Sequence, residues 1–292
     1  MANTLLTPSI IARASIATLY ATTQMADLVY RDYEGDFDGQ VGNVVTIRKP
    51  AVFTANVFSR PTGTVLQDVT ETSTSVTLDT LLDVSFAVTA EDWAMKIQDF
   101  QAQFLAPAME AFNQKIDQML LGLSVDVTTL VPLALADQTA RNSSLQLVDA
   151  GKALNDAKVP LAGRSTVMGT FKIAQMVRDP LFTNAAYSGS TQGLTEASIG
   201  RKFGFDNYMS QNEATTLGLA FHKNAFSLVT RTLPVPRGVA ATQAAVAEYK
   251  GLGLRVIYAY NSTLKQDVIS MDLLCGVKTL QPTAACILSA AA

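Results

Sequence analysis

The alternation of apolar and polar residues predicts a long β-hairpin in the first third of the chain. Residues 43–55 and 75–90 both alternate, which is typical of strands with one buried face. One face of the second run carries Val84, Phe86 and Val88. A polar, turn-rich segment joins the two runs, and Pro50 limits the first because proline is not tolerated in a central strand. An isolated two-stranded ribbon is only marginally stable, so we expect this hairpin to lie on another surface.

A second pattern, with an apolar residue at every third or fourth position, predicts helix over residues 91–123. Thr89 and Asp92 resemble a capping box at its start. The phase continues across Pro107, so we expect one kinked helix or a short helix running into a long one. At 1.5 Å per residue the stretch would be about 48 Å long, which suits a core helix of a large α/β domain or a rod spanning a flat subunit. The apolar positions are Trp93, Ile97, Phe100, Phe104, Ala108, Phe112, Ile116, Met119 and Leu123.

The rest of the chain alternates between helical and extended patterns. An amphipathic helix is predicted after Thr7-Pro8, where proline would occupy the first helical position. After Gly122 we expect helix over 143–159, ending before Pro160, a buried strand over 164–170 and a short helix over 171–179. From Leu217 onward the pattern predicts β-strands, with a turn at residues 261–267.

Composition narrows the classes of function. The net charge is −3 and the pI about 5.2, which argues against a surface that neutralises many phosphates. Charged residues make up 16% of the chain, below the usual value of roughly 25%, so much of the surface is neutral, as it is where subunits cover one another. The N-terminus lacks a basic region before its apolar stretch, and no window is long enough for a membrane span, so we expect neither a signal peptide nor a membrane anchor.

Candidate chemistry is sparse. His222 is the only histidine, which leaves no two-histidine metal site and a Ser-His-Asp site that would depend on it alone. The G-x-G of residues 251–256 precedes a strand and lacks a third glycine, so a bulge or tight turn is the better interpretation. The acidic run at residues 32–38 lacks the glutamate that a calcium loop needs at its twelfth position.

Cys275 and Cys286 form neither a disulfide framework nor a zinc motif, and a reducing cytoplasm fits. We therefore expect no catalytic residues, no cofactor and no metal, and an interaction or structural protein rather than an enzyme.

Eight segments in a particular order carry a resemblance that covers nearly the whole chain. They are TPSIIA (7–12), VGNVVTIRKP (41–50), DVSFAVTAEDW (83–93), FLAPAMEAFNQKID (104–117), IGRKFGFDNYMSQN (199–212), AFHKNAFSLVTRTLPVP (220–236), GLGLRVIYAYN (251–261) and MDLLCGVKTLQP (271–282). In this order they resemble the major capsid (coat) proteins of tailed phages, in the branch of coat proteins like that of phage P-twenty-two. Some members of that branch carry an extra domain after the segment matching FDNYMSQN. Here only EATT separates that segment from LGLAFHKN, so the insertion is absent.

The resemblance implies an α+β fold, the HK97-type tailed-phage major capsid fold, with five parts. These are an N-terminal arm (1–40), an extended loop or E-loop (41–88), a spine helix of the peripheral domain (89–123), an axial domain (124–235) and C-terminal strands that complete both sheets (236–292). Pro107 would mark a bend between a short leading helix and the spine helix proper.

The function that the resemblance implies is self-assembly of this chain into hexamers and pentamers of an icosahedral head that encloses double-stranded DNA, in a virion assembled in the host cytoplasm. A scaffolding protein, a portal and cement proteins would be its partners. An encapsulin-like cellular shell on the same fold, and an α/β enzyme built on His222 or on acidic residues, stay open as alternatives. The E-loop is expected to lie across the neighbouring subunit's peripheral domain, with basic E-loop residues facing acidic residues at the start of the spine helix. The expected contact residues are Arg48, Lys49, Val52, Phe53, Phe58, Glu91, Asp92 and Asp99.

Overall fold

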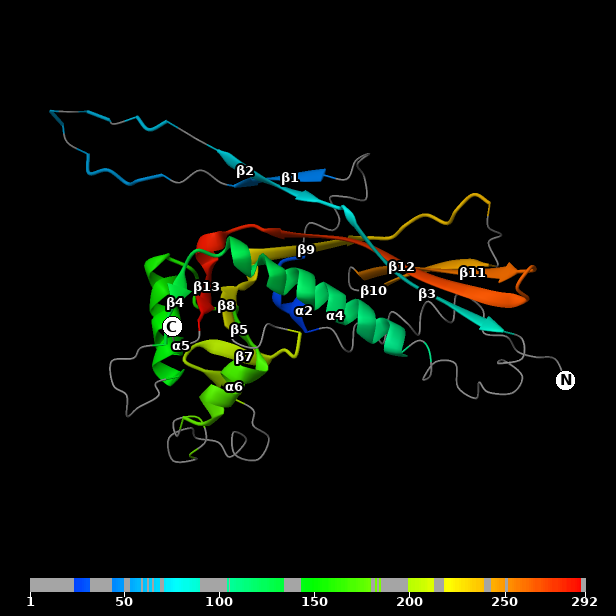
Figure 1. Ribbon diagram of the computed structural model, residues 1–292. Helices are drawn as coiled ribbons and strands as arrows, with labels where there is room; N and C mark the ends of the chain where they lie inside the picture. The colour runs from blue at the N-terminus through cyan, green and yellow to red at the C-terminus, as the bar shows by residue number, and fades with distance from the viewer. Residues whose placement is uncertain are drawn as a thin grey trace.

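The computed structural model contains two β-sheets and a projecting ribbon (Figure 1). It describes residues 24–31, 44–49, 53–58, 60–61, 63–64, 66–68, 71–89, 104, 106–133, 143–179, 182, 184, 199–212, 218–238, 243–249 and 252–289. Within the sheets, strands far apart in sequence pair with each other. Helices and these sheets together give the α+β organisation that the sequence predicts.

The five-stranded sheet is built around one long strand, β12 (Gln266–Thr279). On one side, β12 pairs with β3 over ten residues, from Gln266 opposite Thr89 to Cys275 opposite Thr80. On the other side it pairs first with β11 and then, further along, with β9. All of these pairings are antiparallel. The bounds of the other strands are β3 (Thr80–Thr89), β9 (Phe226–Arg231), β10 (Ala244–Tyr249) and β11 (Leu252–Asn261), and β10 lies at the edge beyond β11.

The six-stranded sheet has its longer strands in the centre and two-residue strands at its edges. Its order is β4 (Leu130–Val131), β13 (Ala285–Leu288), β8 (Gly218–His222), β5 (Arg164–Met168), β7 (Phe205–Met209) and β6 (Arg201–Lys202). β4 runs parallel to β13 and β5 parallel to β7. Every residue of β5 and β8 is buried, because α5 (Ser143–Asp156) and α6 (Thr170–Val177) accompany the sheet (Figure 1).

Two chain crossings join the sheets. β8 continues through the 3-10 turn η4 (Lys223–Ala225) into β9, and β12 continues through η5 (Pro282–Ala284) into β13. The turns contact each other, and the amide of Leu280 donates to the carbonyl of Ala225 at 2.8 Å. A third short 3-10 segment, η3 (Leu123–Asp126), follows α4. Because both crossings meet at one place, the two sheets share a single hydrophobic core.

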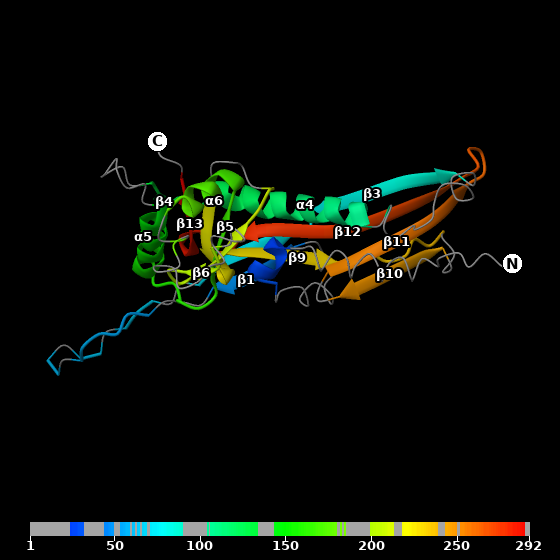
Figure 2. The ribbon, with the colours of Figure 1, turned by 90° about the horizontal axis from the view of Figure 1, so that it is seen from below.

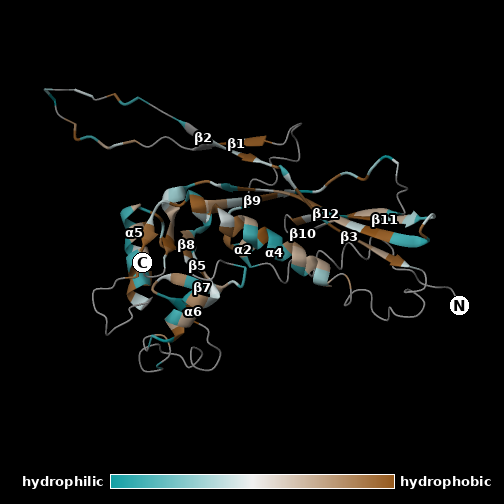
Figure 3. Cartoon of the chain, in the orientation of Figure 1, coloured by the Kyte–Doolittle hydropathy of each residue, from teal (hydrophilic) through white to brown (hydrophobic). Residues whose placement is uncertain are grey.

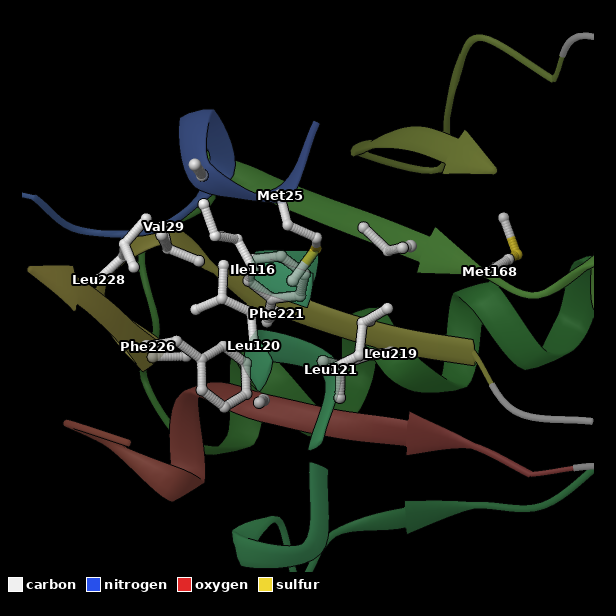
Figure 4. Close-up of a cluster of buried hydrophobic side chains, with 14 of the residues drawn as sticks. Met25, Val29, Ile116, Leu120, Leu121, Met168, Leu219, Phe221, Phe226 and Leu228 are labelled. Atoms are coloured by element: carbon white, nitrogen blue, oxygen red, sulfur yellow. The ribbon is translucent and has the colours of Figure 1, made fainter. Parts of the chain in front are cut away.

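Helix α4 (Ala106–Gly122) runs along the junction of the sheets, and α2 (Met25–Leu28) lies beside it. The apolar pattern predicts which face of α4 is buried, and the structure confirms it: Ala108, Phe112 and Ile116 are at 6% exposure or less. Figure 4 shows side chains from α2, α4, β5, β8 and β9 meeting there: Met25, Val29, Ile116, Leu120, Leu121, Met168, Leu219, Phe221, Phe226 and Leu228.

Several predicted elements are confirmed and one is different. Helices α5 and α6, the buried strand β5 and the turn at residues 262–265 lie where the patterns place them. Val84, Phe86 and Val88 share one face of β3, as predicted. The second run of the hairpin is not one strand, however. Only β2 (Thr72–Thr77) pairs with β1 (Val44–Lys49), and the chain then passes to β3 in the five-stranded sheet.

Pro107 is the second residue of α4 as the structure describes it. Phe104, the last described residue before α4, is also in a helical conformation. Residues 91–103 lie outside the described residues, and so does the predicted N-terminal helix, so the kinked long helix stays a prediction.

Candidate intersubunit surface

The β1–β2 ribbon is fixed to the body at its root. Val45 and Val76 face each other across the ribbon at 6% and 0% exposure and pack with Val229 and Leu280. Tyr30, Ile47 and Leu274 border this group. We call these residues the root cluster. It attaches the ribbon to the face of the five-stranded sheet that carries Leu274.

A glycine makes the attachment possible. Where β2 ends, the chain crosses β12 so closely that a Cβ on Gly276 would lie 2.0 Å from the carbonyl oxygen of Thr77. Backbone cannot yield as the end of a flexible side chain can, so only glycine fits at this crossing. Gly253 plays a similar part, since its Cβ would lie 2.2 Å from the Thr232 side chain. The G-x-G of residues 251–256 leads into a strand, β11, as the sequence predicts.

Beyond the root, the ribbon projects away from both sheets (Figures 1 and 2). Past β1 and β2, the Gln67 side chain links the two limbs of the ribbon. The Thr54 amide donates to Gln67 Oε1 at 2.9 Å, and Gln67 Nε2 donates to the Thr54 carbonyl. Arg60 and Pro61 form a turn near the tip, followed by Gly63 at φ 70°.

We call the described residues between 53 and 68 the distal ribbon. The distal ribbon exposes large apolar side chains. Phe53 is 64% exposed, Val57 97%, Phe58 66% and Leu66 91%. Apolar residues continue along both limbs (Figure 3). Scattered exposed apolar residues are ordinary on protein surfaces, but a group of them on one marginally stable ribbon indicates a surface that a partner covers.

The predicted contact residues divide between the ribbon and the undescribed part of the chain. Phe53 and Phe58 are on the distal ribbon and exposed, as an intersubunit contact requires. Arg48 and Lys49 end β1, opposite Ser73 and Thr72, and their side chains lie outside the described residues. Val52, Glu91, Asp92 and Asp99 lie outside them as well. The charge contact between loop and helix therefore stays a prediction.

A groove that the sequence does not predict opens on the same face of the five-stranded sheet as the root cluster. It has a volume of about 520 Å³ and is lined by Arg231, Thr232, Leu233, Pro234, Val246 and Leu274. Leu274 borders the root cluster and also lines the groove, so the two apolar areas are continuous. The lining residues come from three separate parts of the chain, and no local pattern links them.

Several buried polar side chains of the body have structural partners. Nδ1 of His222 accepts from the Asn224 amide at 3.2 Å and caps η4, and burial lowers the pKa of this imidazole. Asp117 of α4 accepts from the Met25 amide and from Asn212 Nδ2, each at 3.3 Å. Burial nevertheless raises the pKa of this carboxyl. His222 and Asp117 thus hold elements of the body together.

Two buried cations serve similar structural roles. Nζ of Lys172 donates to the Ser289 carbonyl at 3.0 Å, and burial lowers the pKa of this ammonium to about 8. The Arg164 guanidinium donates to the Pro160 and Val159 carbonyls and to Asn155 at 2.7–2.8 Å. Among the described residues no group of three His, Cys, Asp or Glu side chains could hold a metal ion. Within that same part of the chain, no helix combines the length and apolarity that crossing a bilayer takes.

Comparison with known proteins identifies the fold. No protein-family model and no curated protein sequence matches the chain. Among solved structures, a chain of Mycobacterium phage Che8 matches with a TM-score of 0.72 and 23% identity, over 91% of each chain. A chain of the capsid of Cyanophage P-SCSP1u matches with a TM-score of 0.67 and 14% identity, over 92% of this chain and 88% of that one. The predicted tailed-phage major capsid fold is thereby confirmed.

A chain of a virus-like particle is also similar in fold. A chain of a virus-like particle from Pyrococcus furiosus matches with a TM-score of 0.56 and 11% identity, over 96% of this chain and 97% of that one. At these identities the likeness establishes the fold and leaves the function to be argued from the surface of this chain.

Proposed function

We propose that the chain is a major capsid protein that assembles into hexamers and pentamers of an icosahedral tailed-phage head around double-stranded DNA. The observation that carries the proposal is the distal ribbon, whose large apolar side chains have no cover among the described residues of their own subunit. The fold, whose relatives include phage capsid chains, supports it. Contacts in which a ribbon reaches from each subunit to the next are heterologous and close into rings, as capsomers require.

The parts of the subunit take corresponding roles. Residues 41–88 would form the E-loop, with β1 and β2 as its projecting part and β3 as its attachment to the sheet. Residues 1–40 would form the N-terminal arm, 89–123 the spine helix with α4, 124–235 the axial domain with α5 and α6, and 236–292 the C-terminal strands. The resemblance favours the P-twenty-two-like branch without its inserted domain. The net charge of −3 suits a shell that encloses DNA without binding every phosphate, since tight binding would oppose packaging and ejection.

The first test is assembly. The chain should be produced with and without a scaffolding protein, and the product examined by size-exclusion chromatography and negative-stain microscopy. We expect particles of megadalton size with icosahedral outlines. A monomer or dimer that persists under every condition would contradict the proposal.

An encapsulin-like cellular shell is the second candidate, because the Pyrococcus furiosus particle chain aligns with nearly the full length of this one. The content of native particles separates the two. Double-stranded DNA is expected for a phage head, and an enzyme cargo would favour the cellular shell. An enzyme is the weakest candidate, since the only histidine caps a 3-10 turn.

The proposed contact between loop and helix has its own test. Reversing the charges with Arg48→Glu and Lys49→Glu should lower particle yield while the subunit remains folded, because the neighbour's Glu91, Asp92 and Asp99 would then be repelled. Salt screens such exposed pairs, so the loss should be greatest at low ionic strength. Lys223→Glu, an exposed reversal in η4, is the matched control. Normal particle yield from the double reversal would remove this contact from the proposal.

A further inference from the structure

Asp117 of helix α4 is a buried carboxylate that has no cationic partner within the described part of the chain. The residue is 5% exposed, and none of the ion pairs between described residues includes it. Burying an ionised carboxylate is costly unless a cation or strong hydrogen bonds compensate it. The ionised form of Asp117 therefore depends on its hydrogen bonds alone.

Those hydrogen bonds join three parts of the chain. Oδ1 of Asp117 accepts from the amide of Met25, the first residue of α2, and Oδ2 accepts from Nδ2 of Asn212, which follows β7. Both distances are 3.3 Å, whereas hydrogen bonds from N–H donors to a charged carboxylate are usually about 2.7–2.9 Å. Gln24, the N-cap of α2, makes no side-chain cap of its own. One weakly compensated carboxylate thus caps α2 from another helix and holds residue 212 beside it.

Helix α2 is held firmly at one end only. After the helix, the Tyr30 amide donates to the Phe226 carbonyl at 3.0 Å, and the Leu228 amide donates to the Tyr30 carbonyl at 3.2 Å. At the other end, the Asp117 bond accompanies the packing of Met25 into the core cluster of Ile116 (Figure 4). Helix α2 can therefore separate from α4 about the fixed point at Tyr30 without unpairing a strand.

Protonation of Asp117 itself is what changes the charge at this junction. Burial raises the pKa of its carboxyl, and the bonds from Asn212 and Met25 only partly oppose that effect. Residues 210–212 carry no charge. The titratable and charged groups of the other surrounding elements are exposed or bonded to another residue: Asp27, Arg31, Glu110, Lys115, Asp126, His222 and Lys223.

We propose that Asp117 is a pH-sensitive latch for the N-terminal segment: protonated, it holds α2 on α4, and ionised, it lets α2 separate. Because the pKa of the carboxyl is raised above its ordinary value of 3.8 while α2 is docked, the docked state binds the proton more tightly than the separated state. This stabilisation of the docked state is complete below that ordinary value and is lost as the pH rises through the raised one. In neutral solution the chain before α2 can then change its position while both sheets stay folded.

Hydrogen exchange of the unassembled subunit tests the latch, so the test does not depend on the proposed function. Protection of residues 24–31, corrected for the intrinsic pH dependence of amide exchange, is measured at intervals from about pH 5 to about pH 7.5. The subunit is kept dilute because its pI is about 5.2. We expect protection to fall at least about fivefold over this range, and less than about twofold in β12.

The decisive variant is Asp117→Asn, which keeps the side-chain shape and an acceptor for the Met25 amide but does not ionise. Its protection should change less than about twofold with pH and should equal or exceed the parent's value at acidic pH. Glu110→Gln, at an exposed carboxylate of the same helix, is the matched control and should keep the parent's fall. His222 is unchanged in all three chains, so the difference between them reports Asp117.

Three results would overturn the latch. They are protection in the parent that does not change with pH, an Asp117→Asn variant that keeps the parent's dependence, and an Asp117→Asn variant that exchanges faster than the parent at every pH. The last result would make the carboxylate a fixed cap. If Asp117→Asn does not fold, Asn212→Ala replaces it. Losing that donor raises the pKa of Asp117 further, so the fall in protection should move to higher pH, and an unmoved profile would likewise exclude the latch.

Discussion

The root and the distal half of the ribbon both carry large apolar side chains, yet they differ completely in burial. At the root, Val45 and Val76 are almost fully buried, while Val57 and Leu66 further out are almost fully exposed. Burying a large apolar side chain contributes about 1.5–3 kcal/mol. Apolar side chains therefore occur both at the root and further out on the ribbon. The described residues of one subunit bury only those at the root.

The largest expected effect, on particle formation, comes from replacing the exposed apolar side chains of the distal ribbon. Phe53→Ser, Val57→Ser and Leu66→Ser together should abolish particles, because the distal ribbon would lose its apolar contact. The isolated subunit should unfold within about 0.5 kcal/mol of the parent, since these side chains are exposed in it. Particle counts by negative-stain microscopy and urea unfolding measure the two effects.

The matched control is Asn56→Ala, which changes an exposed polar side chain between Phe53 and Phe58. Particles should form from it at the parent's yield. If the triple variant assembles normally, the exposed half of the pattern has no partner and the contrast between root and distal ribbon carries no functional meaning.

At the root, a single methyl group should have the opposite effect, lowering the stability of the subunit itself. Gly276→Ala places a Cβ against the Thr77 carbonyl, so the ribbon root or β12 must shift. Overpacking of this kind costs about 1–3 kcal/mol, and the rigidity of backbone on both sides puts this site near the upper end. Urea unfolding of the unassembled subunit measures the loss.

Gly238→Ala is the comparison variant, because its Cβ would meet no atom within 4 Å. It should leave the unfolding midpoint unchanged. Equal midpoints for Gly276→Ala and the parent would mean that the crossing at β12 is looser than its geometry indicates.

The elements predicted well from sequence are those whose partners are nearby in the chain or whose pattern is self-sufficient. Helix α5 has a regular apolar stripe and ends before Pro160, and β5 is a short run that is buried on both faces. The close approach at Gly253 could be anticipated because a glycine in a strand usually marks one. For these segments, local pattern and tertiary structure agree.

The features that sequence reasoning missed depend on contacts between distant residues. The division of the second alternating run into β2 and β3 follows from the crossing at Gly276, almost 200 residues later in the chain. Buried Asp117 finds its donors at Met25 and Asn212, which no helical pattern contains. The groove likewise joins residues 231–234 to Val246 and Leu274. The exposure of Phe53 and Phe58 could be predicted, but the alternation alone did not indicate which face the neighbour covers.

An effect of intermediate size is expected in the pH dependence of the free energy of unfolding, and it belongs to the body and not to the ribbon. Lys172 has a pKa of about 8 in the folded chain against 10.5 as its ordinary value, so between these pH values the unfolded chain binds more protons. The free energy of unfolding should therefore rise as pH increases from about 8 to about 10.5, by at most ~3 kcal/mol. Lys172→Met should remove that rise, measured by urea unfolding of the unassembled subunit.

Lys152→Met, at an exposed ion pair with Asp156 on α5, is the control and should keep the parent's rise. The triple variant of the distal ribbon should keep it too, because the Lys172 ammonium contacts the Ser289 carbonyl in the body. A flat profile in the parent would show that the buried ammonium is solvated well enough to keep its ordinary pKa.

The smallest effect is expected where Gln67 links the two limbs of the distal ribbon. Gln67→Ala removes both bonds to Thr54, and exposed hydrogen bonds contribute only about 0.5–1.5 kcal/mol each, so global unfolding should not change measurably. Hydrogen exchange of residues 53–58 in the unassembled subunit should nevertheless become faster, since this link holds the register past β1. Gln67→Glu keeps an acceptor for the Thr54 amide and loses the donor to its carbonyl, so its exchange should be intermediate. In particles the three chains should exchange alike, because the neighbouring subunit would then hold the ribbon in place of Gln67. A difference that persists in particles would place the distal ribbon in solvent and remove the contrast between a root covered by its own subunit and a distal half covered by the next.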